Sequence, residues 1–237
     1  MRKVTEAIVL AGGFGTRLQH IVNDVPKPMA PINGVPFLTF IFKKLIASGI
    51  EHVVLSTGYL HDKIEDYYHD TFEGLRISYA QEKEPLGTGG AILYGLSKTK
   101  TEDVLVLNGD TLFDIDFDNL NAFYQDKNTQ LALALRKEKD VSRYGCVITD
   151  EKGKITAFTE KNEASGEGFI NGGIYLLNKQ LFSTLNLPIQ FSFEKDVLEK
   201  IYKSTDIYGL AFDNYFIDIG IEEDYIRAQQ EFPQLKF

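Results

Sequence analysis

The chain has 237 residues, of which 43% are hydrophobic and 25% charged, as expected for a globular protein with a full hydrophobic core. Its formal net charge of −9 argues against nucleic-acid binding, which needs clustered lysine and arginine side chains. No apolar run approaches the ~20 residues of a membrane span, and no secretory signal peptide is evident. The single cysteine, Cys146, excludes an internal disulfide and a cysteine-based metal cage, so we expect a cytoplasmic protein.

Strand and helix signals alternate through the first half of the chain. Short apolar segments predict buried strands at residues 7–10, 53–56, 77–80 and 104–107. Helices are predicted between them, from residue 37 to a C-cap at Gly49, around residues 64–68, and at residues 91–96. Uniformly apolar strands separated by helices indicate a parallel sheet that is covered on both faces.

The second half is richer in strands, which are predicted at residues 131–135, 145–148, 155–159, 170–177, 207–211 and 215–219. A turn at residues 150–153 is predicted to join two of them as a hairpin, and helices are predicted at residues 193–202 and 221–231. No linker, low-complexity tract or internal repeat interrupts the sequence. We therefore predict a single α/β domain over residues 1–237, with a mixed, mostly parallel sheet.

A glycine-rich segment, residues 10–18 (LAGGFGTRL), directly follows the first predicted strand. Glycines remove the side chains that would keep a polyanion away from backbone N–H groups, while Thr16 and Arg17 add a hydroxyl donor and a permanent cation. A strand that leads into such a loop, with helical residues after it, is how α/β proteins present a phosphate to a helix N-terminus. The segment is therefore predicted to bind a nucleotide or phosphate, with Gly12, Gly13 and Gly15 approaching it.

Two well-known phosphate loops do not match this segment. The P-loop requires a Gly-Lys-Ser/Thr ending, and no lysine follows these glycines. The dinucleotide fingerprint requires a third glycine three residues beyond the Gly-x-Gly pair, and that position is Leu18. A second cation is predicted to lie nearby, because the prolines on either side of Lys27 hold it on a stiff, extended segment.

Carboxylates are the candidate metal ligands. Asp110 follows a buried strand, at the end where parallel sheets bind ligands, and it suits a Mg²⁺ that bridges phosphates. Asp218 lies in an apolar strand, where aspartate is rare. We predict that the fold brings these two aspartates together to hold Mg²⁺. The four histidines, His20, His52, His61 and His69, show no ligand spacing and are predicted to lie on the surface or on helix faces.

The segment after the fourth predicted strand has two interpretations. Asn108-Gly109 is a strong hairpin signal, but residues 111–118 carry too many acids for the alternating strand that a hairpin requires. Asp114 and Asp116 in this segment form a second acidic pair, which a metal-dependent glycosyltransferase would use to hold Mn²⁺ on a nucleotide sugar.

Three further segments suit the close approach of a ligand. Residues 84–91 form a second glycine-rich loop after a strand, Glu160-Lys161 ends another strand, and Asn171-Gly172-Gly173 interrupts a third. Glycine inside a strand often marks a ligand that comes close to the backbone.

Together these residues resemble the sugar-1-phosphate nucleotidylyltransferase family. The matching segments span nearly the whole chain, at residues 10–18, 26–32, 84–92, 107–116, 143–145, 170–177, 191–194 and 213–225. The first loop, the Pro-Lys-Pro segment and the two aspartates are specific for the superfamily. Residues 84–92 resemble enzymes that transfer guanylyl groups to manno-configured sugars, and residues 170–177 and 215–220 resemble the heptose 1-phosphate branch.

The resemblance implies a Rossmann-like, GT-A-like domain, with a nucleotide-binding half at about residues 1–115 and a sugar-phosphate-binding half at about residues 116–237. It implies that GTP and D-glycero-α-D-manno-heptose 1-phosphate give GDP-heptose and pyrophosphate for a surface glycan, with Mg²⁺ as the cofactor. The catalytic residues would be Arg17 and Lys27, and the metal ligands Asp110 and Asp218. The nucleotide-binding residues would be Leu10, Ala11, Gly12, Gly13, Gly15, Thr16, Gln81, Glu82, Gly87 and Thr88. The sugar-phosphate-binding residues would be Gly109, Glu160, Lys161, Asn171 and Gly173.

The residue types fit that chemistry. The attacking phosphate monoester has a second pKa of about 6 and is mostly a dianion at neutral pH, so no general base is needed. The obstacle is to bring two polyanions together, which requires alignment and charge neutralisation. Guanine presents N1–H and N2–H₂ donors, so its acceptors are either backbone carbonyls around Gly12 and Gly87 or the carboxylates of Glu82 or Glu84.

Other functions stay open on the sequence. Mannose 1-phosphate with GTP is the nearest alternative, followed by uridylyl or thymidylyl transfer to other hexose phosphates. A glycosyltransferase breaks no triphosphate and has no evident need for Arg17 and Lys27, and a non-catalytic nucleotide-sugar sensor would not need all of Arg17, Lys27, Asp110 and Asp218. The expected partners are GTP and a sugar 1-phosphate, without nucleic acid or membrane, and a homo-oligomer is compatible with the sequence.

Overall fold

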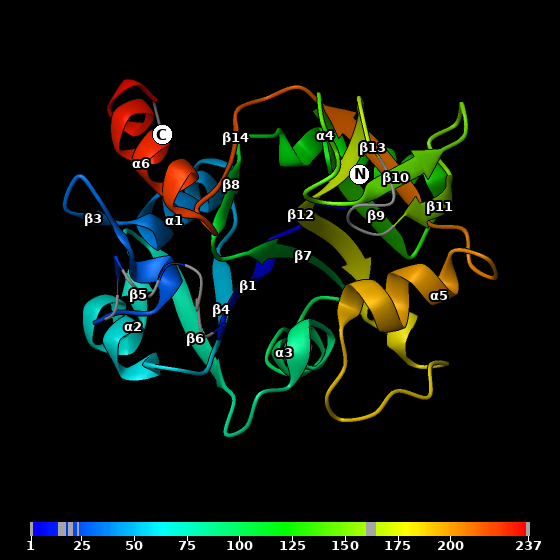
Figure 1. Cartoon of the computed structure of the whole chain (residues 1–237). Coiled ribbons are helices and arrows are strands. Elements are labelled where there is room, and N and C mark those ends of the chain that lie inside the picture. The colour runs from blue at the N-terminus through cyan, green and yellow to red at the C-terminus, as the bar shows by residue number, and fades with distance from the viewer. Residues whose placement is uncertain (1, 14–17, 19–20, 23, 160–164, 236–237) are drawn as a thin grey trace.

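A computed structural model describes residues 2–13, 18, 21–22, 24–159 and 165–235 (Figure 1). Its centre is an eight-stranded sheet with the order β13-β9-β12-β7-β1-β4-β6-β5. In chain order these strands are β1 (Glu6–Ala11), β4 (His52–Thr57), β5 (Thr71–Phe72), β6 (Leu75–Gln81), β7 (Asp103–Asn108), β9 (Leu131–Glu138), β12 (Gly168–Asn178) and β13 (Tyr208–Phe212).

The middle of the sheet is parallel. β1 lies between β4 and β7 and is parallel to both, and β6 is parallel to β4. β12 runs antiparallel between β7 and β9, and β13 is parallel to β9. The predicted mixed, mostly parallel sheet is therefore confirmed. Because β1, β4, β6 and β7 run the same way, their carboxyl ends meet at one edge, which is where open α/β sheets bind ligands.

Helices cover both faces of this sheet (Figure 1). Alternate side chains of β1 point to opposite faces, so Val9 packs in a cluster with Phe42 of the first helix, and Ile8 packs in a second cluster with Ile92 of the third. The helices are α1 (Phe37–Ala47), α2 (His61–Tyr68), α3 (Gly87–Leu96), α4 (Phe117–Lys127), α5 (Glu199–Ile201) and α6 (Glu222–Glu231). Short helical turns are η1 (Lys27–Met29), η2 (Lys179–Phe182), η3 (Phe193–Leu198) and η4 (Phe232–Gln234). Within the described ranges, no helix has the length and apolar character needed to cross a bilayer.

Small two-stranded sheets flank the central sheet. They pair β2 (Pro31–Ile32) with β3 (Val35–Pro36), β8 (Thr111–Phe113) with β14 (Phe216–Asp218), and β10 (Cys146–Thr149) with β11 (Ile155–Thr159). β10 and β11 form the predicted hairpin. Its turn is closed by Asp150, whose Oδ1 accepts the backbone N–H groups of Lys152 and Lys154 at 2.9 Å each.

The acidic segment at residues 111–118 differs from its prediction. It begins with the strand β8 and leads into α4, and the sequence interpretation contained neither element. β8 pairs with β14 rather than with β7, so Asn108-Gly109 is not a hairpin turn. Asp116 is the N-cap of α4, and its Oδ1 accepts the backbone N–H of Asp118 at 2.9 Å. Helix capping therefore explains part of the acidic composition.

His52 is not on the surface or on a helix face, so that prediction was wrong. It lies in β4 and is 3% exposed, because its register partner in β1 is Glu6. Its Nδ1 lies 2.6 Å from Oε1 of Glu6, and its Nε2 lies 2.9 Å from Oγ of Ser78. These buried polar groups satisfy one another. His61 begins α2 and His69 directly follows that helix, as predicted; His20 lies outside the described residues.

Candidate active site

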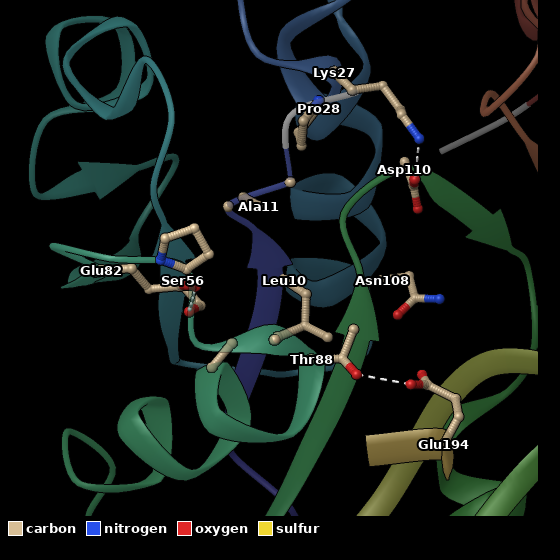
Figure 2. A pocket seen from close by; sticks show the side chains of 15 residues that line it. Leu10, Ala11, Lys27, Pro28, Ser56, Glu82, Thr88, Asn108, Asp110 and Glu194 are labelled. Carbon is tan, nitrogen blue, oxygen red and sulfur yellow. Dashed lines mark hydrogen bonds and ion pairs between the residues drawn. The ribbon is translucent and has the colours of Figure 1, made fainter. Parts of the chain in front are cut away.

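A cavity of about 340 Å³ lies at the carboxyl ends of the parallel strands (Figure 2). The sequence singled out nine of its lining residues, namely Leu10, Ala11, Gly12, Gly13, Lys27, Glu82, Gly87, Thr88 and Asp110. They come from the ends of β1, β6 and β7, the turn η1 and the start of α3. The fold therefore gathers segments that are far apart in the sequence around one hollow, while the binding role of each residue stays a prediction.

Gly12 lies on the cavity wall just beyond β1, where a larger residue does not fit. A Cβ atom at this position would lie 2.9 Å from Oε1 of Glu82 and 3.3 Å from the backbone N of Gly58. Glu82 is itself held at both oxygens, because Ser56 Oγ donates to Oε1 at 3.1 Å and the backbone N–H of Leu86 donates to Oε2 at 2.9 Å. A fixed carboxylate, which can only accept hydrogen bonds when ionised, thus stands beside the start of the glycine segment.

The other residues that the sequence predicted to lie near the nucleotide base differ from Glu82 in their placement. Gln81 ends β6 and is exposed, Glu84 is exposed as well, and neither of them lines the cavity. Gly87 begins α3 with a φ of +71°, and a Cβ atom there would lie 2.5 Å from the carbonyl oxygen of Phe191. Of the two carboxylates that the sequence left open as readers of guanine, only Glu82 lines the cavity.

Lys27 and Asp110 form an ion pair at the other side of the cavity (Figure 2). Lys27 lies in η1, and its Nζ is 2.6 Å from Oδ2 of Asp110, with the two side chains 11% and 31% exposed. The backbone N–H of Gly109 donates to the carbonyl of Leu10 at 2.9 Å, which ties the end of β7 to the end of β1. A Cβ atom at Gly109 would lie 2.5 Å from that same carbonyl oxygen, so the close approach of the two strand ends requires glycine.

Asp218 reaches the same region from the other half of the chain. It ends β14 opposite Thr111, and the backbone N–H of Ile219 donates to the carbonyl of Asp110 at 3.0 Å. Oδ1 of Asp218 accepts the backbone N–H of Gly220 at 2.7 Å. Asp218 does not line the cavity, although its strand end is bonded to the backbone of Asp110. Mg²⁺ prefers oxygen ligands and is usually bound by one or two carboxylates, waters and substrate phosphates, so the residue types of this pair fit it. Among the residues described, no cluster of three or more histidines, cysteines or acids offers an alternative metal site.

Thr88 and Glu194 meet across the cavity floor. Oγ1 of Thr88 donates to Oε2 of Glu194 at 2.7 Å (Figure 2), and the same hydroxyl accepts the backbone N–H of Phe193 at 2.8 Å. The Thr88 hydroxyl is therefore engaged by η3, and a nucleotide contact from this residue would come from its backbone.

Asn171 and Gly173, predicted on the sugar-phosphate side, lie on β12 and do not line the cavity. Oδ1 of Asn171 accepts the backbone N–H of Gly173 at 3.0 Å, and the register between β12 and β9 shifts between Asn171 and Tyr175. Gly173 has a φ of +72°, and a Cβ atom there would lie 2.5 Å from Nδ2 of Asn108. The irregular strand thus packs against the cavity-lining Asn108 from behind.

The remaining predicted residues, Gly15, Thr16, Arg17, Glu160 and Lys161, lie outside the described residues. Conversely, the cavity is also lined by residues to which the sequence assigned no role, namely Pro28, Ser56, Pro85, Ala91, Asn108 and Glu194. Ser56 and Asn108 carried a usable signal, since both are polar residues at the carboxyl ends of buried strands. Glu194 carried one too, because it belongs to a segment that matches the family.

The competing acidic pair lies elsewhere. Asp114 and Asp116 line a separate hollow with Lys44, and Nζ of Lys44 is 2.5 Å from Oδ1 of Asp114. Since neither aspartate faces the glycine-lined cavity, the geometry gives the glycosyltransferase alternative no support.

Glycines, a fixed carboxylate and a lysine–aspartate pair at the carboxyl ends of parallel strands suit the binding of a nucleotide. Residues 6–234 match the family described as Nucleotidyl transferase, to which the chain belongs. Members of this family generally use a divalent metal ion.

The relatives of this chain include heptose 1-phosphate guanylyltransferases. The D-glycero-alpha-D-manno-heptose 1-phosphate guanylyltransferase of Aneurinibacillus thermoaerophilus is 48% identical, over 95% of this chain and 97% of the relative. The enzyme of the same name from Campylobacter jejuni is also 48% identical, over 93% of this chain and 96% of its own. The crystal structure of HddC from Yersinia pseudotuberculosis complexed with GMP-PN has a TM-score of 0.86 and 35% identity, and the match covers 97% of this chain and 100% of HddC.

Proposed function

We propose that this chain transfers GMP from GTP to D-glycero-α-D-manno-heptose 1-phosphate, with release of pyrophosphate. The observation that carries the proposal is that Glu82 and the Lys27–Asp110 pair face one cavity from opposite sides (Figure 2), and that Gly12 and Gly13 also line it. An acceptor for the base and a cation for phosphates are thus available in a single site. The choice of substrates is supported by two relatives at 48% identity over nearly their whole length.

The reaction needs charge neutralisation more than proton transfer. An oxygen of the sugar phosphate attacks the α-phosphorus of GTP, and the bond from that phosphorus to the β-phosphate oxygen breaks as pyrophosphate leaves. The attacking phosphate is already ionised, so no base has to remove a proton. Lys27 neutralises the phosphates that are being joined. Arg17 is proposed to act on the leaving pyrophosphate, and Lys161 on the incoming sugar phosphate.

Asp110 and Asp218 are the residues that would hold a magnesium ion. When bound, such an ion neutralises phosphate charge and aligns the reacting groups. Asp110 is also the partner of Lys27 at 2.6 Å. A phosphate that Lys27 binds therefore lies beside the carboxylate that is proposed to hold the metal.

Glu82 is the proposed reader of guanine. Its two oxygens can accept the N1–H and N2–H₂ donors of that base, whereas adenine has an unprotonated N1 that would face the carboxylate unfavourably. Bonds from Ser56 and Leu86 hold Glu82 in place, so the acceptor is oriented before the base arrives.

The proposed division into two halves is supported by the origin of the lining residues. All of them except Glu194 come from the first 115 residues, the half proposed to bind the nucleotide. Gly173, on the proposed sugar-phosphate half, packs against Asn108, and Asn171 accepts the backbone N–H of Gly173.

A substrate grid tests the proposal. The protein is incubated with each of GTP, ATP, UTP and dTTP against heptose, mannose and glucose 1-phosphates in the presence of Mg²⁺, and pyrophosphate release is measured. The highest kcat/KM is expected for GTP with D-glycero-α-D-manno-heptose 1-phosphate. A clear preference for mannose 1-phosphate would correct the sugar, and a preference for UTP or dTTP would overturn the role of Glu82.

A further inference from the structure

Glu194 has no role in the mechanism above, although its carboxylate collects hydrogen bonds from three side chains. Oε2 accepts from Thr88 Oγ1 at 2.7 Å and from Ser192 Oγ at 3.0 Å. Oε1 accepts from the hydroxyl of Tyr175 at 3.5 Å, which is the long limit for such a bond. The carboxylate thus joins the start of α3, its own turn η3, and β12.

The link continues from Tyr175 to the proposed sugar-phosphate side. Tyr175 is 1% exposed, and its hydroxyl accepts a hydrogen bond from Nδ2 of Asn171 at 2.7 Å. Burial, with the Glu194 carboxylate nearby, raises the pKa of Tyr175 well above its ordinary value. The hydroxyl therefore keeps its proton and can donate it only onward, toward Glu194.

The three described hydroxyls that bond to this carboxylate, those of Thr88, Tyr175 and Ser192, all act as donors to it. The Thr88 hydroxyl already accepts from the backbone N–H of Phe193 at 2.8 Å, and the Ser192 hydroxyl accepts from the backbone N–H of Lys195 at 3.2 Å. Their protons are consequently free to point at Glu194. Only a residue with two acceptor oxygens satisfies all three donors, so an amide at position 194 would leave one contact with two opposed donors.

We infer that Glu194 is a positioning residue that links the proposed nucleotide side of the cavity to the proposed sugar-phosphate residues of β12, which lie outside the cavity lining, through the chain of bonds Thr88–Glu194–Tyr175–Asn171. The inference rests on the proposed function, because Thr88 lies on the proposed nucleotide side and Asn171 on the proposed sugar-phosphate side. Glu194 fixes the start of α3 through one oxygen and the irregular part of β12 through the other. It therefore sets the spacing at which the two substrates meet.

Substitutions at the two ends of this chain of bonds give separate kinetic signatures. Thr88→Val keeps the volume but removes the short bond to Glu194 together with the acceptor of the Phe193 N–H. It is expected to raise KM for GTP about tenfold with KM for the sugar phosphate little changed. Tyr175→Phe removes both bonds of the hydroxyl, the 3.5 Å bond to Glu194 and the 2.7 Å bond from Asn171. It is expected to raise KM for the sugar phosphate about threefold with KM for GTP little changed. Glu194→Ala should raise the KM values for both substrates. In Glu194→Gln, the amide oxygen can still accept from Thr88 and Ser192, while the N–H₂ group faces the Tyr175 hydroxyl, so this variant should raise only KM for the sugar phosphate.

The variants are expected to fold, because backbone bonds hold the segment just before η3 to the start of α3 independently of Glu194. The N–H of Gly89 donates to the carbonyl of Phe191, and the N–H of Phe191 donates to the carbonyl of Leu86, at 3.0 Å each. Tyr124→Phe is the matched control. It removes a buried tyrosine hydroxyl that donates to a carboxylate, Asp103 Oδ1, at 2.8 Å outside the cavity, so it should lower Tm and leave both KM values unchanged.

Hydrogen–deuterium exchange of the substrate-free protein tests the link without any activity. Glu194→Ala should speed exchange at both residues 86–90 and residues 170–175, Thr88→Val only at the first segment, and Tyr175→Phe only at the second. The inference is overturned if Glu194→Ala affects one segment alone, or if Tyr124→Phe gives the same pattern. If the wild type releases no pyrophosphate in the substrate grid, the proposed function fails, and the exchange pattern still decides whether the link exists.

Discussion

Lys27 and Asp110 lie 83 positions apart in the sequence and meet at 2.6 Å in the cavity. The two side chains therefore occupy the same part of the cavity, although their proposed ligands, a phosphate for Lys27 and a metal ion for Asp110, carry opposite charges. With the proposed roles, a phosphate would compete with Asp110 for Lys27, and a metal ion would compete with Lys27 for Asp110. Each ligand would then free the group that the other ligand needs, so we expect binding of both to be favoured over binding of either alone.

Loss of Lys27 should impair turnover more than it impairs folding. Lys27→Ala is expected to lower kcat by about 10²–10³-fold, by comparison with the removal of a single charge-stabilising donor at other transition states. Steady-state pyrophosphate release measures the effect. Lys44→Ala is the matched control, since Lys44 also pairs with an aspartate, Asp114, but outside this cavity. Activity of Lys27→Ala within a few-fold of the Lys44→Ala activity would contradict the assignment.

Removal of divalent metal should abolish activity, and Mg²⁺ should restore it. Asp218→Asn is expected to raise the Mg²⁺ concentration for half-maximal activity at least about tenfold, because the neutral amide loses one charge–charge contact with the ion. Calorimetric titration of Mg²⁺ in the presence of GTP measures the same shift without turnover. An unchanged Mg²⁺ requirement in both experiments would exclude Asp218 as a ligand.

The sequence predicted most strands and helices because their apolar runs are short and bounded by polar segments. The sequence does not reveal β8 and α4, because the acids at residues 111–118 disfavour a strand and only the fold shows that one of them caps a helix. Asp116 performs that capping through the N–H of Asp118 at 2.9 Å. Local composition could not reveal that β8 pairs with β14, about 100 residues later, because that pairing depends on the tertiary fold.

The candidate site was predictable where chemistry is local and unpredictable where it depends on packing. Glycines and Lys27 are visible in the sequence because their flanking residues constrain the backbone. The choice between Glu82 and Glu84 could not be made, since two nearby acids look alike until β6 ends and turns one of them into the cavity. His52 was misplaced for the same reason, because its partner Glu6 lies 46 residues away.

The buried pair of Glu6 and His52 should make the free energy of unfolding depend on pH in the acidic range. Burial would raise the pKa of Glu6, but hydrogen bonds from His52, Thr101 and Lys100 outweigh it and lower the value from 4.5 to about 2. A carboxylate with a depressed pKa stabilises the fold above pH 4.5, and this contribution is lost as the pH falls toward 2. The contribution is on the order of 3 kcal/mol at neutral pH.

Urea unfolding between pH 7 and pH 2.5 measures this dependence. Glu6→Gln should be less stable than the wild type at pH 7, and its stability should fall less steeply below pH 4.5. Glu51→Gln alters an exposed acid one residue before β4 and should retain the wild-type slope. Equal slopes for the wild type and Glu6→Gln would show that Glu6 titrates alike in the folded and unfolded chains.

Base selection should depend on Glu82 and not on Glu84. In Glu82→Gln, an N–H₂ group replaces one acceptor oxygen and meets the donors of guanine, so kcat/KM for GTP is expected to fall about 10²-fold, as when two bonds to a charged group are lost. Glu84→Gln, in an exposed residue that does not line the cavity, should change it less than twofold. Because the Ser56 and Leu86 bonds hold residue 82 from behind, the variant side chain should stay in place, and a crystal structure of it can check this. Inosine triphosphate lacks the N2–H₂ donor, so Glu82→Gln should lower kcat/KM for inosine triphosphate less than it lowers kcat/KM for GTP. An equal decrease for both nucleotides would mean that Glu82 supports the loop without contacting the base.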